Sequence, residues 1–264
     1  MIPTLRNSGL KGRVVVIASQ RSGKCIPSEL VKIFLVEEAL VYATDINRHI
    51  LEIVEAEAEE RVGSKITTYL LDFDKPDMIE RFVREIKAKE GRIDILVTDF
   101  GLLEFVPHLK PFHLQTTEEW ARQFKTIVED TLVWTKALAP IMMEQGSGRI
   151  IHVTSEAARV GTPFMSVYAA AKAAVVGFTR SLAAELARYN ITANCVSLGI
   201  QEIEERGEAS DPARSKLEKI RKTIPLRRFS EPEEIAYMIA FLASDLGSYI
   251  TGQNISVAGG LVMT

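Results

Sequence analysis

Three polar side chains, Ser155, Tyr168 and Lys172, have the types and the spacing that proton transfer requires. Tyr168 and Lys172 lie four residues apart in the stretch YAAAK, and on a helix this spacing places both on one face. A free phenol titrates near ~10, and a neighbouring lysine charge favours the phenolate, so Lys172 makes Tyr168 a better proton-transfer group near neutral pH. Ser155 ends the apolar stretch RIIHVTS, from which its hydroxyl can hydrogen-bond a carbonyl or alcohol oxygen beside the tyrosine.

These residues must be positioned by a chain that alternates strand-like and helix-like segments. Seven short stretches predict strands: RVVVIAS, ALVYATDI, KITTYLLDF, IDILVTDF, GRIIHVTS, ITANCVSL and NISVAGG. Segments with helical periodicity lie between them, such as HILEIVEAEAEERVG, KPDMIERFVREIKAKEG and TEEWARQFKTIVEDTLVWTKALAPIMMEQG. We therefore predict the α/β class, with a single Rossmann-type doubly wound parallel sheet of about seven strands and helices on both faces.

The 264 residues suit a single domain over residues 1–264, because no low-complexity linker or internal repeat divides the chain. One segment, Gly199–Pro225, is long, charged and poor in apolar residues. A solvated surface insertion is the simpler interpretation. Its position after the last-but-one strand favours a lid beside the strand carboxyl ends, where open α/β sheets bind ligands.

Composition argues against several classes of partner. The net charge of −3 gives no indication of nucleic-acid binding. The two cysteines, Cys25 and Cys195, and the four histidines show no metal-ligand or disulfide spacing, which favours a reducing cytoplasm and no metal site. The first thirteen residues lack the apolar core of a signal peptide, and no apolar run is long enough to span a bilayer. We expect a cytoplasmic protein that acts away from membranes.

The sequence resembles the short-chain dehydrogenase/reductase family over nearly the whole chain. The serine, tyrosine and lysine above match that family's catalytic pattern, and Ile224–Gly260 resembles its C-terminal end almost residue for residue. The resemblance implies an oxidoreductase in which Ser155 orients the substrate oxygen, Tyr168 moves the proton, and Lys172 tunes the tyrosine and holds the ribose of NAD. It also implies a tetramer, because that C-terminal end commonly packs against a neighbouring subunit. SEAARVG (Ser155–Gly161) and the terminal GGLVMT are similar to the hydroxyacyl-CoA dehydrogenases of anaerobic aromatic degradation, which implies an acyl-CoA substrate.

The chain departs from the family's pattern around the cofactor. The first loop, which reads TGxxxGxG in the family, has Ser19 and Cys25 where glycines let the backbone approach the pyrophosphate or the sheet. In TDFG, which stands for the family's NNAG, Phe100 replaces alanine close to where the adenosine ribose is expected. Ile127 stands where a helix asparagine continues the proton relay, and isoleucine can neither accept nor pass a proton. Leu198 replaces the proline that follows the sixth strand. Together these changes predict weak or absent NAD binding.

Other features of a nucleotide site remain. Gly23, Arg21 and the neighbouring Lys24 precede a predicted helix whose N-terminus is a reasonable anion site, and Ser19 borders the same loop. Asp45 ends the second strand, where an acid binds the ribose hydroxyls of NAD and repels the extra phosphate of NADP. The resemblance adds Asp72 as an adenine contact and Gly101 as the retained glycine of TDFG. Strand-end turn chemistry is the simpler explanation of both aspartates.

Three functional hypotheses follow. The first is a working NAD-dependent hydroxyacyl-CoA dehydrogenase, favoured by the serine, tyrosine and lysine and by Asp45. The second is a degenerate, non-catalytic subunit in a homo- or heterotetramer with an active homologue, similar to the heteromeric enzyme that oxidises 2-(hydroxy(phenyl)methyl)succinyl-CoA in anaerobic toluene degradation. The third is a cofactor-free enzyme on this fold, against which the retained Lys172 counts. The first two share the oxidation of a β-hydroxyacyl thioester and differ in whether this chain turns over.

Overall fold

A seven-stranded sheet forms the centre of the computed structural model, which describes residues 4–20, 26–64, 66–101, 110–200, 218–219 and 221–263. The strand order is β3-β2-β1-β4-β5-β6-β7, and every neighbouring pair is parallel. The strands are Val14–Gln20 (β1), Leu40–Asp45 (β2), Thr67–Leu70 (β3), Ile95–Phe100 (β4), Gly148–Ser155 (β5), Ile191–Leu198 (β6) and Asn254–Val257 (β7). The predicted α/β doubly wound fold and its seven strands are confirmed.

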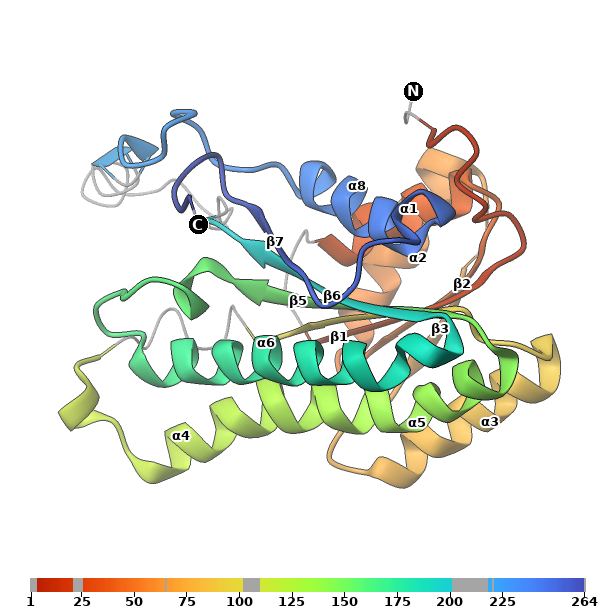
Figure 1. Ribbon diagram of the computed structural model, residues 1–264, viewed down its shortest axis with the longest axis horizontal. Helices are drawn as coiled ribbons and strands as arrows, with labels where there is room; N and C mark the ends of the chain where they lie inside the picture. The colour runs from red at the N-terminus through yellow and green to blue at the C-terminus, as the bar shows by residue number, and fades with distance from the viewer. Residues whose placement is uncertain are drawn as a thin grey trace.

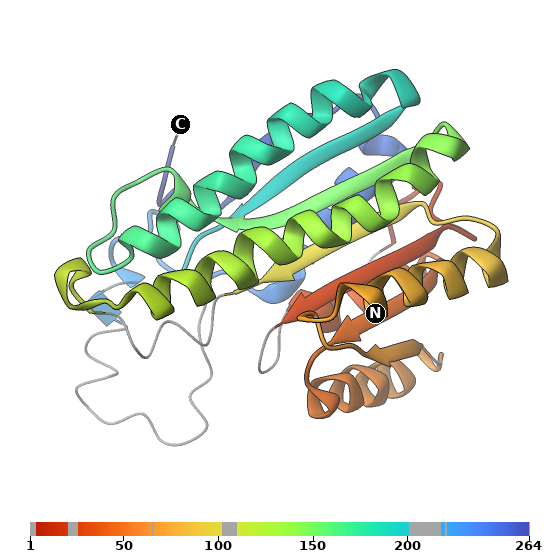
Figure 2. The same ribbon diagram turned by 90° about the horizontal axis from the view of Figure 1, so that it is seen from below.

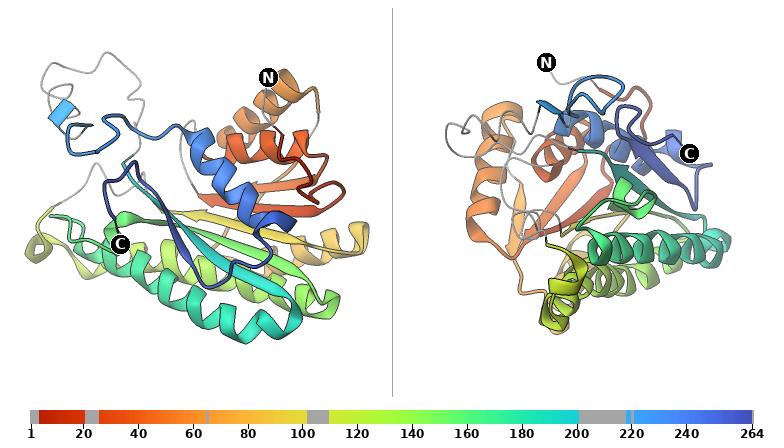
Figure 3. Two further views of the ribbon diagram at one scale, coloured as in Figure 1. Left: turned by 45° about the horizontal axis from the view of Figure 1, so that its top comes forward. Right: turned by 90° about the vertical axis from the view of Figure 1, so that its left-hand side faces the viewer.

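Helices cover both faces of the sheet (Figure 1). One face carries α1 (Ile26–Val36), α2 (Arg48–Val62) and α8 (Pro232–Ala243). The other carries α3 (Pro76–Glu90), α5 (Asp130–Gln145) and α6 (Ser166–Leu186), which run alongside one another in Figure 2. α4 (Thr117–Phe124) and the π-helical turn η3 (Lys125–Glu129) lead directly into α5, and short 3-10 turns lie at Phe112–Leu114 (η2), Glu156–Ala158 (η4), Ala187–Tyr189 (η5) and Asp245–Gly247 (η6). Figure 3 shows the sheet between the two helical layers, and no helix within the described ranges is long and apolar enough to cross a membrane.

The sheet is buried on both faces, because successive strand residues point to opposite sides and both sides are apolar. In β1, Val15 and Ile17 pack under α1 and α8, whereas Val14 and Val16 pack on the side of α3, α5 and α6. This alternation fixes where each strand-end side chain points. It therefore decides which functional candidates can meet.

Phe100, the last residue of β4, lies in an aromatic cluster inside the core. Its ring makes an edge contact with Phe73 at 5.7 Å between centroids, and Phe73 makes another with Trp134 at 5.5 Å. All three side chains are buried on the face covered by α3 and α5. Asp45 and Ser19 point to the opposite face, since Ala43 and Ile17, two residues earlier on their strands, pack under α1. The expectation that the Phe100 ring crowds a cofactor ribose is therefore wrong, and this ring gives no reason for weak NAD binding.

We predict that Phe100→Ala destabilises the fold by about 3–5 kcal/mol, because truncation leaves a cavity among rings that cannot close it. Urea unfolding followed by circular dichroism measures this free energy. The matched control is Phe112→Ala, which removes a ring that is 54% exposed and stacked only on Trp120. The control should cost no more than about 1 kcal/mol. Equal losses in the two variants would contradict the assignment of Phe100 to the core.

Candidate functional site

Lys172 is held by the carboxyl ends of two central strands. It lies on α6, an alanine-rich helix of 21 residues with high intrinsic helix propensity, which packs against β5 and β6. Its side chain is 1% exposed, and Nζ donates to the carbonyl oxygen of Phe100 at 2.8 Å and to that of Val153 at 3.1 Å. The ammonium therefore links α6 to β4 and β5 at the sheet edge where open α/β folds bind ligands.

Tyr168 lies one helical turn before Lys172 and faces the same region. Its side chain is buried, and the Lys172 ammonium lies 5.8 Å from the centre of its ring. The turn after Ser155, η4, contacts α6, and Ala157 packs against the apolar cluster that contains Tyr168. Ser155 ends β5 two residues beyond Val153, and its Oγ accepts the N–H of Ala157 at 3.2 Å. That bond uses one lone pair and leaves the hydroxyl hydrogen to be donated to a substrate oxygen. The structure thus gathers the three predicted catalytic candidates in one region.

A neutral histidine lies below this region. His152, in β5, is buried, and its Nδ1 is 2.8 Å from Oγ1 of Thr98 on β4. Burial, together with the nearby charge of Lys172, lowers the pKa of His152 to about 3. The imidazole therefore carries no charge near neutral pH, and it adds no second cation beside Lys172. Burial also raises the pKa of the Cys195 thiol to about 11, so this side chain behaves as a core residue.

Ile127 closes the space behind the tyrosine. It lies in the π-helical turn η3, is buried, and packs in one cluster with Tyr168 and Ala171. Gly101 has a φ of +73°, and a Cβ placed on it would lie 2.5 Å from Cγ1 of Ile127. Both the backbone conformation and the lack of space for a side chain therefore favour glycine at this position. The carbonyl of Ile127 accepts the hydroxyl of Thr131 at 2.7 Å. The side chain of Ile127 therefore offers no group that could extend a proton path from Lys172.

The cofactor candidates fall into two groups. Asp45 and Ser19 are buried side chains at the carboxyl ends of the adjacent strands β2 and β1. Asp72 lies beyond β3, where its carboxylate accepts the N–H of Asp74 at 3.1 Å and pairs with Lys75 at 2.8 Å. Lys75, together with that backbone bond, holds the pKa of Asp72 below its usual value. These contacts stabilise the turn after β3, which is the role that strand-end turn chemistry predicts for Asp72.

Asp99 is a candidate that the sequence reasoning missed. It is fully buried near the end of β4, and β1 and β4 pair in the register that places Ser19 beside it. Its signal in the sequence is an acidic residue inside the apolar stretch IDILVTDF. Arg21, Gly23 and Cys25, and most of the predicted lid at Gly199–Pro225, lie outside the described residues.

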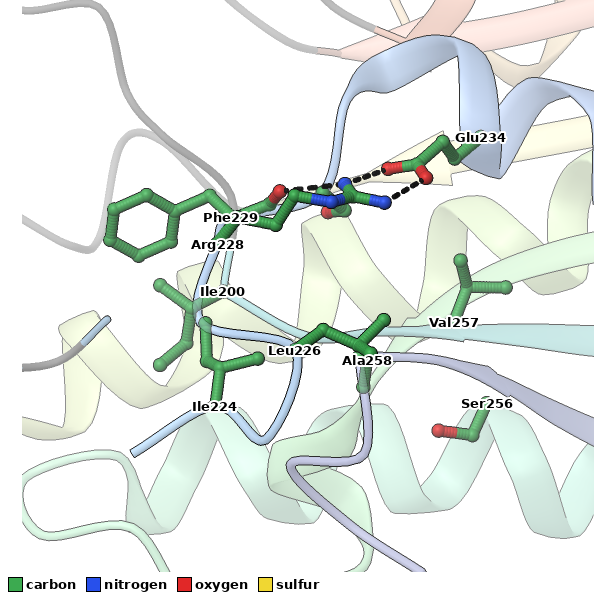
Figure 4. A pocket seen from close by; sticks show the side chains of 11 residues that line it. Ile200, Ile224, Leu226, Arg228, Phe229, Glu234, Ser256, Val257 and Ala258 are labelled. Carbon is green, nitrogen blue, oxygen red and sulfur yellow. Dashed lines mark hydrogen bonds and ion pairs between the residues drawn. The ribbon is translucent and has the colours of Figure 1, made fainter. Parts of the chain in front are cut away.

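A small pocket lies at the carboxyl edge of β6 and β7 (Figure 4). Its volume is about 190 Å³, and its lining is mainly apolar, with the Arg228–Glu234 ion pair on one side. Ile200 and Ile224 come from the two ends of the predicted lid, and both contribute to the lining. In strand register, Ser155 pairs with Leu198 and Leu198 with Val257, so the pocket lies two strands from Ser155 along the same edge.

The doubly wound sheet, with a serine at the end of β5 and a tyrosine and lysine on the next helix, places the chain in the class of dinucleotide-fold oxidoreductases. A family model described as "Enoyl-(Acyl carrier protein) reductase" matches residues 9–262. The chain belongs to the short-chain dehydrogenase/reductase family, as its sequence pattern indicated.

Individual relatives agree with this assignment. The chain is 37% identical over 259 residues to "3-oxoacyl-[acyl-carrier-protein] reductase FabG" of Thermotoga maritima, covering 96% of this chain and 99% of the relative. It is 34% identical to "Dehydrogenase/reductase SDR family member 6" of Rattus norvegicus, covering 95% and 98%. Among solved structures, levodione reductase has a TM-score of 0.84 at 25% identity, covering 95% and 98%. The NAD+-bound xylitol dehydrogenase has a TM-score of 0.82 at 26% identity, covering 95% and 99%.

Lys125 in the π-helical turn beside Tyr168 forms an ion pair with the buried Asp130, the first residue of α5. Lys125 lies 2.5 Å from Asp130, which is buried, and 3.3 Å from Asp74, whose side chain is exposed. Burial raises the pKa of Asp130 to about 6, although Lys125 opposes the shift. Because the folded state then holds a proton that the unfolded chain releases near pH 4, the contribution of Asp130 to stability falls as pH rises from about 4 to about 6.

We predict that Asp130→Asn removes this dependence. As pH rises from 4.5 to 7, the free energy of unfolding of the wild type should fall by about 1–3 kcal/mol relative to that of the variant. Urea unfolding at four pH values measures it. Asp74→Asn removes the exposed carboxylate that contacts the same lysine, and it should change the slope much less than Asp130→Asn does, because burial is the main cause of the Asp130 shift. A wild-type slope in Asp130→Asn would show that this carboxyl group does not titrate differently in the folded state.

Proposed function

We propose that this chain takes part in the oxidation of a β-hydroxyacyl thioester to the β-oxoacyl thioester, as the degenerate subunit of an enzyme whose active subunit is a homologue. The observation that carries the reaction is the shared placement of Ser155, Tyr168 and Lys172 at the carboxyl edge of the sheet, with Nζ of Lys172 fixed by two carbonyls. Relatives such as the 3-oxoacyl-[acyl-carrier-protein] reductase of Thermotoga maritima support the same kind of substrate and product.

The chemistry follows from the properties of these three groups. If the chain itself turns over, Ser155 would donate its hydroxyl hydrogen to the substrate oxygen and orient it, since its acceptor side already holds the Ala157 N–H. Tyr168 would then accept the hydroxyl proton, and Lys172 would stabilise the phenolate that makes this transfer possible. In the degenerate subunit the same groups keep this arrangement, and the homologue carries the turnover. Two backbone carbonyls accept hydrogen bonds from Lys172, and these bonds fix its ammonium group beside the tyrosine. Removal of hydrogen from the carbon requires a hydride acceptor, and NAD supplies that chemistry when bound.

The residues fit NAD only in part. Asp45 is suited to the ribose hydroxyls, and Lys172 lies where the resemblance places the other ribose. Ser19, whose buried Oγ has no hydrogen-bond partner among the described residues, and the buried Asp99 lie where a pyrophosphate is expected. The side chain of Ile127 offers no proton-transfer group behind the tyrosine. These observations favour a subunit with weak NAD binding, and no step through NAD is assigned to this chain.

Two alternatives differ in what the chain itself does. An active NAD-dependent hydroxyacyl-CoA dehydrogenase is favoured by the intact catalytic region and by Asp45. A cofactor-free enzyme is disfavoured, because Lys172 is retained and its ammonium is fixed beside Tyr168. The resemblance to the heteromeric 2-(hydroxy(phenyl)methyl)succinyl-CoA dehydrogenase supports the subunit hypothesis over both.

Two surfaces of this chain are candidates for binding the acyl group and the partner subunit. The apolar pocket beside Ile200 and Ile224 suits the hydrocarbon end of an acyl-CoA, because its lining offers little to a polar group. At the C-terminus, Val262 is already buried within this chain, whereas Met263 is 78% exposed. The exposed part of this end supports contact with another subunit in a homo- or heterotetramer.

We expect the purified chain to show no micromolar NAD+ site by calorimetry and no oxidation of a 3-hydroxyacyl-CoA. Co-expressed with a glycine-complete homologue, the complex should turn over, and Tyr168→Phe should leave its rate within about twofold, well short of the ~100-fold or greater loss expected for a catalytic acid–base group.

The control is Tyr189→Phe, which removes a tyrosine hydroxyl beyond the far end of α6. A loss of ~100-fold or more with Tyr168→Phe alone would assign catalysis to this chain and favour the active dehydrogenase. Absence of turnover by any complex would contradict the proposed reaction.

A further inference from the structure

The pocket at the carboxyl edge of β6 and β7 has walls that are joined by backbone hydrogen bonds. Gly199, which follows β6, donates its N–H to the carbonyl of Val257 at 3.2 Å. Leu226 donates its N–H to the carbonyl of Gly259 at 3.1 Å. A Cβ on Gly199 would lie 2.8 Å from Cα of Ala258, and Gly259 has a φ of +59°, so glycine at both positions permits this close approach. The chain on both sides of the pocket is therefore tied to β7 and the turn after it, which gives the pocket a defined shape.

The size and lining of this pocket suit a compact apolar group. Its volume is about 190 Å³, and the residues that line it all lie within the described ranges. Ile224 and Phe229 are 2% and 8% exposed, whereas Leu226 is 63% exposed and leaves apolar surface that a ligand can cover (Figure 4). An apolar cavity of roughly 150 Å³ is large enough to bind benzene. The volume therefore accommodates a group of the size of one six-membered ring.

The two charged side chains of the pocket neutralise each other. Nη1 and Nη2 of Arg228 each donate to a carboxylate oxygen of Glu234 at 2.6 Å. Glu234 also accepts the N–H of Glu231 at 2.9 Å, at the start of α8. Arg228 holds the pKa of Glu234 below its usual value, so both groups stay charged near neutral pH. The pair adds no net charge to the pocket, which favours an uncharged ligand group.

Ser230 gives the pocket one further hydrogen-bonding group. It lines the pocket, and its Oγ is buried and makes no hydrogen bond within the described part of the chain. A serine just before a helix often caps that helix, but here Glu234 bonds the N–H of Glu231 instead. A buried hydroxyl without a partner is uncommon, and this one can donate to a ligand oxygen or accept from it. The pocket therefore combines an apolar lining with a single polar contact point.

We propose that this pocket binds an uncharged group of the size of a six-membered ring, with one hydroxyl or carbonyl oxygen that hydrogen-bonds Ser230. This group is the far end of the acyl thioester, an identification that rests on the proposed function. Ser155 pairs with Leu198 and Leu198 with Val257, so the pocket lies roughly 10 Å from Ser155 at the usual spacing of strands. The ring is therefore separated by several bonds from the carbon that is oxidised.

The experiment measures the affinities of phenol and benzene, two probes that differ by one hydroxyl, for the purified chain and for Ser230→Ala by NMR titration. Both probes should bind the wild type. Ser230→Ala should weaken phenol by about three- to tenfold, the effect of one neutral hydrogen bond. It should change the affinity of benzene by less than about twofold, because benzene makes no hydrogen bond to lose.

Matched variants locate the binding site of the probes. Ser155→Ala removes the serine hydroxyl of the catalytic region and should leave phenol affinity unchanged. Ala258→Leu fills the pocket, and it should weaken both probes by roughly tenfold or more, because a close-packed interior leaves no alternative space. Its control is Ala139→Leu, since Ala139 is also 8% exposed but lies on the face covered by α3, α5 and α6. Thermal unfolding checks that each variant is folded.

Three results would overturn the proposal: no binding of either probe to the wild type, equal phenol affinity in the wild type and a folded Ser230→Ala, or loss of phenol binding in Ser155→Ala instead. Because Ser230→Ala removes only one oxygen, the comparison does not depend on Ala258→Leu being folded. A complex with the homologue that oxidises no 3-hydroxyacyl-CoA would contradict the proposed function, whereas the two probes report on the pocket without turnover. The two failures are therefore distinguishable.

Discussion

The site depends on one buried ammonium group. Lys172 loses nearly all of its hydration, which costs several kcal/mol for an unpaired charge, and hydrogen bonds to the carbonyls of Phe100 and Val153 offset much of that cost. These carbonyls belong to the carboxyl ends of two different strands, so the same bonds fix α6 over the edge of the sheet. Tyr168, one turn away, takes its position from this attachment. His152 stays neutral because it is buried, and the nearby charge of Lys172 disfavours its protonation further.

The elements of the fold could be predicted from the sequence, whereas the directions of some side chains could not. Continuous apolar stretches identify the strands because this sheet is buried on both faces. For that same reason they do not show which face each residue takes, since the pattern does not alternate between apolar and polar. Phe100 is the clearest case. Its position in the chain suggested a cofactor contact, and only its contact with Phe73, in the cluster that contains Trp134, places its ring in the core.

Hydrophobic periodicity also did not predict the local distortion of a helix or the burial of an acidic side chain. The periodicity predicts helix from Thr117 to Gly146, and a π-helical turn at Lys125–Glu129 interrupts this segment. One additional residue in a turn leaves the apolar pattern nearly unchanged, yet it determines where Ile127 points. Asp99 was missed because an acidic residue at a strand end ordinarily indicates a turn. Its burial beside Ser19 depends on the register of β1 with β4, a contact between residues far apart in the chain.

The candidate residues at the sheet edge lie on its two faces, and this separates two requirements of a dinucleotide enzyme. On the side of α6, the ammonium of Lys172 lies beside Tyr168. On the side of α1, the buried side chains of Ser19, Asp45 and Asp99 lie at the ends of three neighbouring strands. A dinucleotide has to satisfy both faces at once, since its ribose approaches the first and its pyrophosphate the second. Because the two groups of residues lie on different faces of the sheet, a change on the side of α1 need not disturb the geometry around Lys172 and Tyr168.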